Sequence, residues 1–473
     1  MKTFRFLAGV GALALLAGCA STGVQHAPAS MVKPAALGLQ AAPAAAFPAS
    51  QWWTRYHDPV LDGLITEALA GNPDLQVAAA RVRQARAGVG GARAALLPHL
   101  GAGLTSTREL FSANDIYGPY GGQVFGVSQA TVQGSYSFDF FGRNRAALDA
   151  AVGTARAAAA SEQAARVLLA AQVADTYFAL ARVDAQRALL RATVRQRQRI
   201  VQLVRERVRA GLQPELQLRP LQAEIPQLRL KLDQNAQAAG ELRHALAALL
   251  GAGPARTARL APALRALPSP QAPTELPAAL LGHRADIVAA RWQVRAALAG
   301  VRQARAAFYP NVNLAAFVGL DSITYASFLH AGSQTWGVGP AVTLPIFEGG
   351  ALRANLRGAR AGADAAIASY NATVIGAVRE VADALTRRAS VARQSAQQRD
   401  ALALARDALH LAKRRYDAGL GNELGVLDAR GAVLQLQRAG VDLKTQALVD
   451  DVALQRALGG GYGDAARQAA PRS

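Results

Sequence analysis

The sequence contains two copies of one pattern in the same order. NPDLQVAAARVRQARA (72–87) is similar to RADIVAARWQVRAALA (284–299), at an offset of 284 − 72 = 212. FDFFGRNRAALDAA (138–151) is similar to IFEGGALRANLRGA (346–359), at an offset of 346 − 138 = 208. The second offset holds without a gap to the ends of both copies. A chance match would not keep one offset for so long, so we interpret the chain as a duplication whose two halves fold alike.

Each copy is predicted to contain a helix, two strands, a long helix and a second helix running back along it. In copy one the first helix covers about residues 62–97 and ends at Pro98, because proline lacks the N–H group that a helix interior needs. The long helices, residues 143–210 and 351–418, contain neither proline nor a cluster of turn residues. At 1.5 Å per residue each is expected to be about 100 Å long.

Glycines and prolines divide the chain further. The long helices end at Gly211 and Gly419, which we interpret as the turns at the helix tips, and a proline-rich stretch joins the two copies. The predicted organisation is a signal peptide (1–18), a lipidated linker (19–50), the first repeat (51–253), the proline-rich linker (254–277), the second repeat (278–460) and a flexible tail (461–473).

The predicted strands alternate between apolar and polar residues. In copy one the apolar face holds Val132, Gly134, Tyr136, Phe138 and Phe140, and in copy two Trp336, Val338, Val342, Leu344 and Ile346. A membrane barrel strand, with one face to lipid and one to the lumen, has this alternation, and a strand of a soluble β-sandwich has it too.

Four strands cannot close a barrel, since the smallest barrels need about eight, and open sheet edges are not tolerated inside a membrane. Strands inserted in a membrane would therefore require several copies of the chain. The long helices also indicate that several copies assemble. In copy two a narrow heptad stripe needs neighbouring helices to bury it; its members are Ile367, Val374, Val378, Val381 and Leu385.

The N-terminus has the features of an export signal. Lys2 and Arg5 precede the uncharged stretch 6–18, which is shorter than the roughly 20 residues of a transmembrane helix. LAGC, ending at Cys19, resembles the lipobox of bacterial lipoproteins, in which the cysteine is acylated and becomes the first residue of the mature protein. A non-lipidated signal with a chance cysteine is the alternative. Ala20 resembles the residue found in lipoproteins sent to the outer membrane.

Composition argues against several other functions. The net charge is +20, almost entirely from arginine, but the arginines are spread along helical stretches without interleaved aromatic residues, so we predict no nucleic-acid binding. The seven histidines are scattered without metal-ligand spacing, and no phosphate-binding loop or nucleophile motif occurs. We therefore predict no enzyme activity, no cofactor and no metal site. No stretch after the signal reaches 18 uncharged apolar residues, so no transmembrane helix is expected.

Several stretches in order resemble the TolC-like outer-membrane efflux proteins, and among them the NodT-type lipoproteins. They are WWTRYHDPVLDGLITEALAGNPDL (52–75), SFDFFGR (137–143), PIFEGGALRANL (345–356) and RRYDAGLGNELGVLDA (414–429). The resemblance implies a mainly α fold with β-strands, assembled as a homotrimer with a twelve-stranded outer-membrane barrel continuous with a twelve-helix periplasmic tunnel.

The resemblance also implies a function. Such a protein is the passive exit duct of a tripartite efflux pump, lipid-anchored in the outer membrane, and works with a periplasmic adaptor and an inner-membrane transporter of the RND type. Small molecules are the favoured cargo. Two alternatives stay open: an exit duct for type I protein secretion, and a periplasmic coiled-coil lipoprotein that forms no channel.

Two kinds of site residue follow from the resemblance and the motifs. Gly142, Gly349 and Gly350 lie where strand passes into helix, where glycine permits unusual backbone angles. Asp428 matches the position where family members close the periplasmic end with a ring of aspartates. Alternatively, Asp428 is only a solvated carboxylate that favours the start of a helix. Family members with a second aspartate have it at the position of Gly425.

The first copy departs from this pattern at its tip. Pro220 occupies the position that corresponds to Asp428, at 428 − 208 = 220, and Pro214 and Pro226 lie on either side of it. Pro214 suits the first turn of a helix. Pro220 and Pro226 are each expected to remove a hydrogen bond and to kink the helix.

Overall fold

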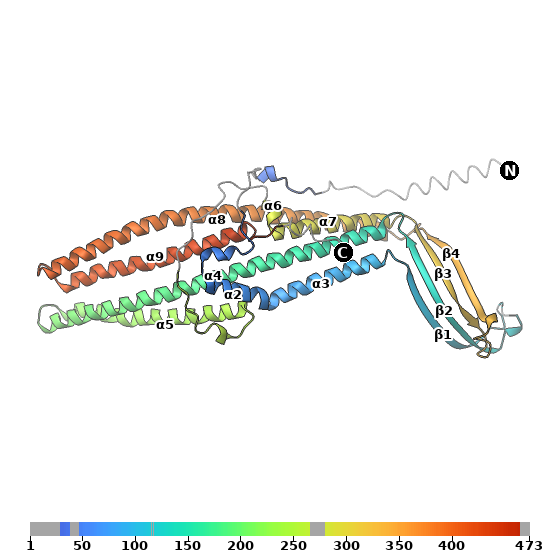
Figure 1. The fold of residues 1–473 in the computed structure, drawn as a ribbon, viewed down its shortest axis with the longest axis horizontal. Coiled ribbons are helices and arrows are strands. Elements are labelled where there is room, and N and C mark those ends of the chain that lie inside the picture. Colours follow the sequence, from blue (N-terminus) through green and yellow to red (C-terminus); the bar gives the residue numbers. More distant parts are fainter. Residues whose placement is uncertain (1–28, 38–46, 115, 117, 265–279, 464–473) are drawn as a thin grey trace. The chain divides into compact units, whose positions relative to one another are not determined.

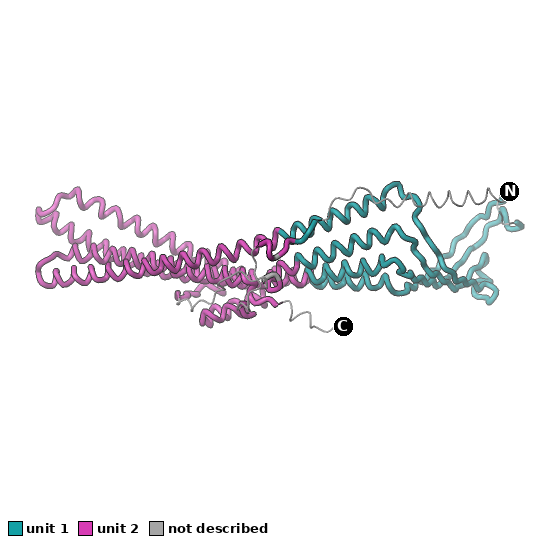
Figure 2. The backbone as a smooth tube through the Cα atoms, turned by 90° about the horizontal axis from the view of Figure 1, so that it is seen from above, with its two compact units in different colours: residues 1–31, 82–157, 290–371 teal, residues 32–81, 158–289, 372–473 magenta. Residues whose placement is uncertain are grey.

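The computed structural model describes residues 29–37, 47–114, 116, 118–264 and 280–463. The proposed signal peptide and Cys19, most of the proline-rich linker and the end of the tail therefore lie outside the described residues. The chain forms two compact units, each built from several separate segments. Unit 1 comprises residues 1–31, 82–157 and 290–371, and unit 2 comprises 32–81, 158–289 and 372–473 (Figure 2).

Unit 1 contains one antiparallel sheet of four strands, as the alternation predicts. The strands are β1 (His99–Leu110), β2 (Val124–Phe138), β3 (Asn311–Ser322) and β4 (Gln334–Thr343), paired in the order β1-β2-β3-β4 (Figure 1). The central pair joins the two copies of the duplication, since Val132 of β2 faces Val318 of β3. β1 and β4 are edge strands, and each has a ladder partner on one side in the described chain.

The first predicted helix of copy one is instead two helices, α2 (Pro59–Gly71) and α3 (Pro73–Ala94), so the expectation of one continuous helix over residues 62–97 is wrong. Asn72 separates them. Its Oδ1 accepts hydrogen bonds from the backbone N–H groups of Asp74 and Leu75, at 2.9 and 3.3 Å, which caps α3. Its Nδ2 donates to the carbonyl oxygen of Leu249 at 2.9 Å, which ties the break to a distant helix.

The long helices form as predicted. α4 (Arg143–Arg209) and α8 (Ala351–Asp417) each contain 67 residues, and their first residues are 351 − 143 = 208 apart. The returning helices α5 (Leu218–Leu249) and α9 (Glu423–Ala457) end 457 − 249 = 208 residues apart. α7 (Ala285–Ala306) is the counterpart of α3, with both ends displaced by 212. The duplication thus extends to the element boundaries.

The remaining helices are short. They are η1 (Pro34–Leu37), η2 (Trp52–Tyr56), η3 (Gly118–Tyr120), η4 (Glu215–Gln217), η5 (Pro254–Arg256), α6 (Leu280–His283) and η6 (Ala331–Ser333). By length and composition α4 also contains a stretch that could cross a membrane. Half of that stretch is buried in the protein, and core helices of soluble proteins have the same properties, so this is weak evidence for a span.

The main core of unit 2 forms where the N-terminal segment packs on the long helix. Trp52, Trp53 and Tyr56 of η2 are buried against Ile65 of α2 and Tyr177 of α4. Burying a large apolar side chain contributes roughly 1.5–3 kcal/mol. These aromatic residues therefore attach η2 firmly to the helices.

Two tyrosine hydroxyls within this core are paired with carboxylates. The hydroxyl of Tyr177 donates to Asp58 at 2.8 Å, and the same aspartate caps α2 through the N–H groups of Val60 and Leu61. The hydroxyl of Tyr56 donates to Asp451 of α9 at 2.9 Å. The segment that precedes the first repeat helix is thus joined to the last helix of the second repeat.

The prolines at the tip of copy one affect the helix less than predicted. Pro214 lies outside α5, at the cap of the short turn η4. Pro220 is the third residue of α5, where the N–H groups have no partner within the helix in any case, so it removes no hydrogen bond. Only Pro226 lies in the helix interior. In copy two, α9 begins directly after Asn422, without a short helical turn like η4 before it. Asn422 caps α9 by accepting a hydrogen bond from the N–H of Gly425 at 2.9 Å.

Candidate channel elements

One face of the sheet in unit 1 is apolar across all four strands in the part nearer the strand-to-helix junctions; farther along, the same face carries Ser106, Ser128, Ser322 and Arg108. The register aligns Ala102, Val132, Val318 and Trp336 in one row, and side chains in one row lie on the same face. The neighbouring rows extend this face with Leu100, Leu104, Ala130, Gly134, Tyr136, Phe138, Val312, Leu314, Ala316, Leu320, Val338, Pro340 and Val342.

This apolar face is not covered by the rest of the described chain. Leu100 is 80 % exposed and Trp336 75 % exposed. Exposed apolar surface of this extent is rare on soluble monomers and marks contact with a membrane or with another protein. The apolar face is therefore open in the single chain.

The opposite face is polar and rich in small residues. Its rows contain Thr131 opposite Gly319 and Gln133 opposite Phe317, and its larger apolar members are Phe317, Val127 and Phe125. The other members include Gly101, Gly103, Thr105, Gln129, Ser135, Ser137, Asn311, Asn313, Asp321, Thr335, Gly337, Gly339, Ala341 and Thr343. A sheet with one lipid-compatible face and one water-compatible face is what a membrane β-barrel requires.

The strand-to-helix junctions contain the glycines that the sequence indicated. Gly142 has φ of 74°, Gly349 57° and Gly350 90°, values that side chains with a Cβ rarely adopt. Gly211 and Gly419, at the ends of the long helices, have φ of 72° and 71°. These backbone angles explain why glycine is present at each position.

Asp139 holds the first junction together, and sequence reasoning missed it. Its carboxylate accepts hydrogen bonds from the N–H groups of Asn144 and Arg145, at 2.9 and 2.8 Å, at the start of α4. Asn144 in turn donates to the carbonyl of Ala95, just after α3, at 3.1 Å. A carboxylate near the N-terminus of a helix also favours the helix dipole. The sequence signal that could have identified Asp139 is its position as an acidic residue just before the predicted start of a long helix.

Helices α4 and α9 are joined near the tips by an ion pair. The guanidinium of Arg199 donates to both carboxylate oxygens of Glu423, at 2.8 and 2.7 Å, in the bidentate geometry that gives strong pairs. Gln196, three residues earlier on α4, donates to the carbonyl of Leu427. Higher up, Arg182 pairs with Asp442 at 2.6 Å. Sequence analysis identified none of these residues.

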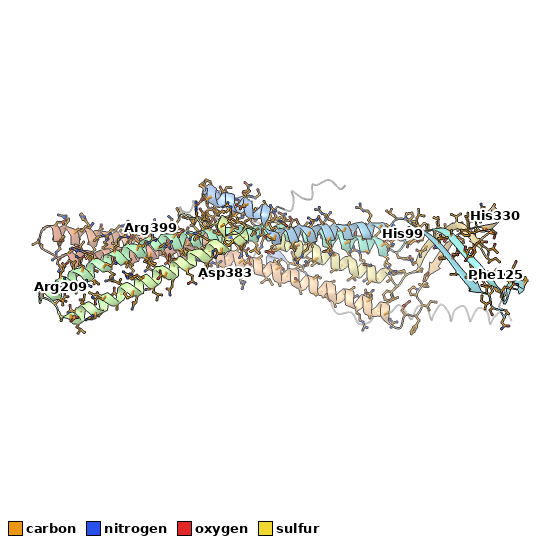
Figure 3. All side chains as sticks on the ribbon, turned by 90° about the horizontal axis from the view of Figure 1, so that it is seen from below. His99, Phe125, Arg209, His330, Asp383 and Arg399 are labelled. Atoms are coloured by element: carbon orange, nitrogen blue, oxygen red, sulfur yellow. The ribbon has the colours of Figure 1, made fainter. Side chains whose placement is uncertain are left out.

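Apolar packing accompanies these polar contacts. Ile200, Val201 and Val204 of α4 form a buried cluster with Leu218 of α5 and Leu427 of α9. α4 therefore lies between α5 and α9 at this end of unit 2, and Arg209, labelled in Figure 3, is its last residue.

Asp428, the predicted gate residue, lies in the second turn of α9, directly after the buried Leu427. Its side chain is exposed, on a different face of the helix from the leucine. The position suits a carboxylate that projects away from the cluster at the helix ends. A gate role stays a prediction.

Buried carboxylates gather where η2 meets α4 and α9. Asp450 and Asp451 are each 2 % exposed, and arginines lie beside them: Arg387 is 3.4 Å from Asp450 and Arg55 is 3.4 Å from Asp451. Burial raises the pKa of Asp175 to about 6. Its Oδ1 has no hydrogen-bond partner among the described residues, and neither do Oδ2 of Asp450 and Oδ1 of Asp451. Burial and the neighbouring Asp451 raise the pKa of Tyr56 well above its usual value, so this hydroxyl keeps its proton.

The first described residues are held by α8. Asp364 accepts a hydrogen bond from the backbone N–H of Ala29 at 3.1 Å, and Asn371 donates to the carbonyl of Ser30 at 2.9 Å. The chain that follows the predicted lipid anchor is thus fixed to a helix. Within the described part of the chain, no group of three or more histidine, cysteine, aspartate and glutamate side chains could hold a metal ion.

The sequence matches one family model twice, over residues 64–252 and 276–460; the family is described as outer membrane efflux protein. The multidrug resistance outer membrane protein MdtQ of Escherichia coli O6:H1 is 33 % identical over 467 residues, which are 95 % of this chain and 96 % of that protein. The fusaric acid resistance protein FusA of Burkholderia cepacia is 37 % identical over 360 residues, 74 % of this chain and 68 % of that protein.

Solved structures agree. The outer membrane protein VceC of Vibrio cholerae has a TM-score of 0.80 and 34 % identity, covering 88 % of this chain and all of that one (100 %). The outer-membrane channel OprN has a TM-score of 0.80 and 28 % identity, covering 92 % and 97 %. With the apolar sheet face, the duplicated long helices and a match over both repeats, the chain belongs to the outer membrane efflux protein family and is a protein of the outer membrane.

Proposed function

We propose that the protein is the exit duct of a tripartite efflux pump and conducts small molecules passively across the outer membrane. The observation that carries this proposal is the four-stranded sheet with one exposed apolar face, on which Leu100 and Trp336 are 80 % and 75 % exposed. Lipid tails would cover that face, and the polar face opposite it would line a water-filled lumen.

Closure of the sheet requires more than one chain. β1 and β4 are the edge strands, and a membrane does not tolerate their unpaired N–H and C=O groups. Pairing β4 of one copy with β1 of the next removes both edges. Three copies would close a barrel of about twelve strands, above the minimum of about eight, and their long helices would form a twelve-helix tunnel into the periplasm.

Small molecules are the proposed cargo. Relatives are named for resistance to fusaric acid and to multiple drugs. The proposed partners are a periplasmic adaptor, which would grip the tunnel, and an inner-membrane transporter of the RND type, which would supply the energy. The duct itself catalyses nothing and needs no cofactor. Asp428 is the proposed gate residue, where three carboxylates around a narrow opening would repel one another.

A lipid on Cys19 is proposed to aid delivery and anchoring. The hydrogen bonds that hold Ala29 and Ser30 on α8 support it, since they fix the chain ten residues after this cysteine. Ten extended residues reach up to about 35 Å, enough to leave the helix surface for a membrane. Cys19→Ser should lose acylation, detected by palmitate labelling, yet remain in the membrane because the strands anchor it.

The experiment that tests the function is ion conductance of the purified, full-length protein in planar lipid bilayers. Discrete channels support the duct, and a folded protein without channels supports the coiled-coil lipoprotein.

A further inference from the structure

The first turns of α8 carry three arginines on one face. Arg353, Arg357 and Arg360 are spaced i, i+4 and i+7, and helix residues with this spacing share a face. We call these three residues the arginine stripe. Arg353 and Arg357 are exposed, and Arg360 is half-buried. Residues 344–363 contain one carboxylate, that of Glu348, so this stretch has a net charge of 3 − 1 = +2.

The arginine stripe begins where the apolar sheet face ends. Ile346 and Phe347, between β4 and α8, are 77 % and 89 % exposed. Exposed aromatic side chains at the edge of the apolar band mark the membrane interface of a β-barrel. At 1.5 Å per residue, Arg353 lies about 3 Å and Arg360 about 14 Å along α8 from its start. The headgroup layer is roughly 5–8 Å thick, so at least the first two arginines of the stripe are within reach of it.

The N-terminal linker shows which way this face of α8 points. Asp364 accepts from the N–H of Ala29, and Asn371 donates to the carbonyl of Ser30. The two side chains follow Arg353 by 11 and 18 residues, which places them within about 60° of the stripe around the helix. A lipid attached near the start of the chain can reach the membrane only from outside the proposed barrel. The face that binds the linker, and the stripe with it, is therefore the outward face.

The first repeat lacks this surplus of positive charge. Subtracting 208, the stripe corresponds to Arg145, Asp149 and Val152. Arg145 lies 3.9 Å from Asp139, and Asp149 pairs with Arg302 at 2.8 Å, so charges at the first junction offset one another within the chain. The stripe is thus particular to the junction beside which the linker is bound.

We infer that the arginine stripe binds the phosphate groups of anionic phospholipids in the periplasmic leaflet of the outer membrane. This inference rests on the proposed function and on the proposed lipid at Cys19. A guanidinium matches a phosphate group in charge and in its paired hydrogen bonds. Residues 20–28 of the linker contain no aspartate or glutamate that could take the place of the phosphates.

The contribution of each arginine should depend on its depth. One arginine near an anionic membrane surface strengthens the attraction about fivefold. The effect decays over a Debye length of about 8 Å at physiological ionic strength. Arg357, about 9 Å along α8, should therefore contribute more than Arg360, about 14 Å along it. The stripe gives each subunit an electrostatic contact with the membrane beside the tether that the acylated cysteine would supply.

A fluorophore beside the stripe tests the inference in the full-length trimer. Ala354→Cys provides an exposed position near the start of α8, and Cys19 is the only other cysteine in the sequence. The labelled protein is reconstituted in phosphatidylcholine vesicles that contain nitroxide-labelled phosphatidylglycerol or nitroxide-labelled phosphatidylcholine. Phosphatidylglycerol should quench at about two- to fivefold lower content, and added salt should reduce this preference.

Two combined variants separate the stripe from the general basicity of the chain. Replacing all three stripe arginines by glutamine should remove the preference for phosphatidylglycerol, whereas replacing them by lysine should keep most of it. The matched control replaces Arg379, Arg393 and Arg399 by glutamine. These are exposed arginines of the same helix, at least about 42 Å along it, and Arg399 is labelled in Figure 3. This control should keep the full preference.

Trimer mass and conductance are measured on the same samples. Conducting trimers that show no preference for phosphatidylglycerol, or that lose it equally in the stripe and control variants, would overturn the inference and leave the proposed function standing. A preference lost with lysine as fully as with glutamine would also overturn it, because the charge is kept. Unmodified protein that forms neither trimers nor channels overturns the proposed function, and the inference with it.

Discussion

Arg199 of α4 and Glu423 of α9 form a bidentate ion pair, with N–O distances of 2.8 and 2.7 Å, although 224 residues separate them in sequence. The pair joins the first repeat to the second near the turns of both helix hairpins. Both side chains are partly exposed, at 42 % and 29 %, so the pair adds little to global stability. Its position instead makes it a local tie between two long helices.

Arg199→Ala should therefore loosen the tips of the proposed duct without unfolding the chain. The loss of unfolding free energy should stay below about 1 kcal/mol, while the resting conductance in bilayers should rise. Arg256→Ala is the matched control, because Arg256 forms a pair of similar exposure with Glu67 of α2, at 2.6 Å, away from the tips. Equal conductance changes in the two variants would contradict the assignment.

The two faces of the sheet should respond oppositely to charge. Val132→Arg places a guanidinium on the face proposed to contact lipid, at a cost of about 2–4 kcal/mol near the bilayer centre. Insertion into outer membranes, measured as protein that resists extraction by urea, should fall sharply. Thr131→Arg, one residue away on the polar face, should insert normally. If both variants insert equally well, the apolar face is not in lipid.

The sequence could predict the long elements because their patterns are local and repeated. Residues 143–209 contain neither proline nor a cluster of turn residues, and the 208 offset relates the ends of α4 to those of α8. The break at Asn72 was missed although it has a local signal: Gly71, Asn72 and Pro73 are turn residues, and proline favours the first position of a helix. The contact of Asn72 Nδ2 with Leu249, far along the chain, has no such signal. Pro220 was expected to kink the helix because the helix was not known to start at Leu218, two residues before it. That start follows the short turn η4, which the sequence did not predict.

The candidate site was predictable only in part, for the same reason. Junction glycines are visible because positive φ angles demand that residue type at a known point of the pattern. The pairs Arg199–Glu423 and Arg182–Asp442 join distant helices, and no local pattern distinguishes those arginines from the many others in the sequence. The residues that share a row across the sheet could not be predicted either, because they depend on the register of β2 against β3.

Asp175 should make stability depend on pH. Burial raises its pKa to about 6 in the folded protein, above the ordinary value of 3.8. The folded state therefore binds a proton more readily than the unfolded state, so this residue stabilises the fold as pH falls from about 6 to 4 and costs stability above 6. A shift of this size corresponds to about 2–3 kcal/mol.

Asp175→Asn should accordingly raise the unfolding temperature at pH 7.5, with the gain disappearing toward pH 4. Tryptophan fluorescence of the protein in detergent reports this unfolding, because Trp52 and Trp53 lie in the same core. Asp383, labelled in Figure 3, is the counterpart at 383 − 175 = 208 and is exposed, so Asp383→Asn should show no such pH-dependent gain. A gain that is constant from pH 4 to 7.5 would show that ionisation is not its cause.

Asp428→Ala tests the proposed gate. Removing three carboxylates from a narrow opening should weaken block of the channel by added divalent cations, without changing trimer formation. Asp400→Ala, an exposed position on α8, serves as the control and should leave block unchanged. If conductance and cation block are the same in Asp428→Ala as in the unmodified protein, Asp428 is only a solvated residue near the start of α9.

Single-channel recording of the purified, full-length protein tests the central claim most directly. Protein eluting as a trimer and added to a planar bilayer should produce discrete conductance steps of one uniform size, because each closed barrel contributes one pore. A trimer that is folded, by circular dichroism, and inserts into the bilayer without any conductance steps under applied voltage, in both the unmodified protein and Arg199→Ala, would contradict the account.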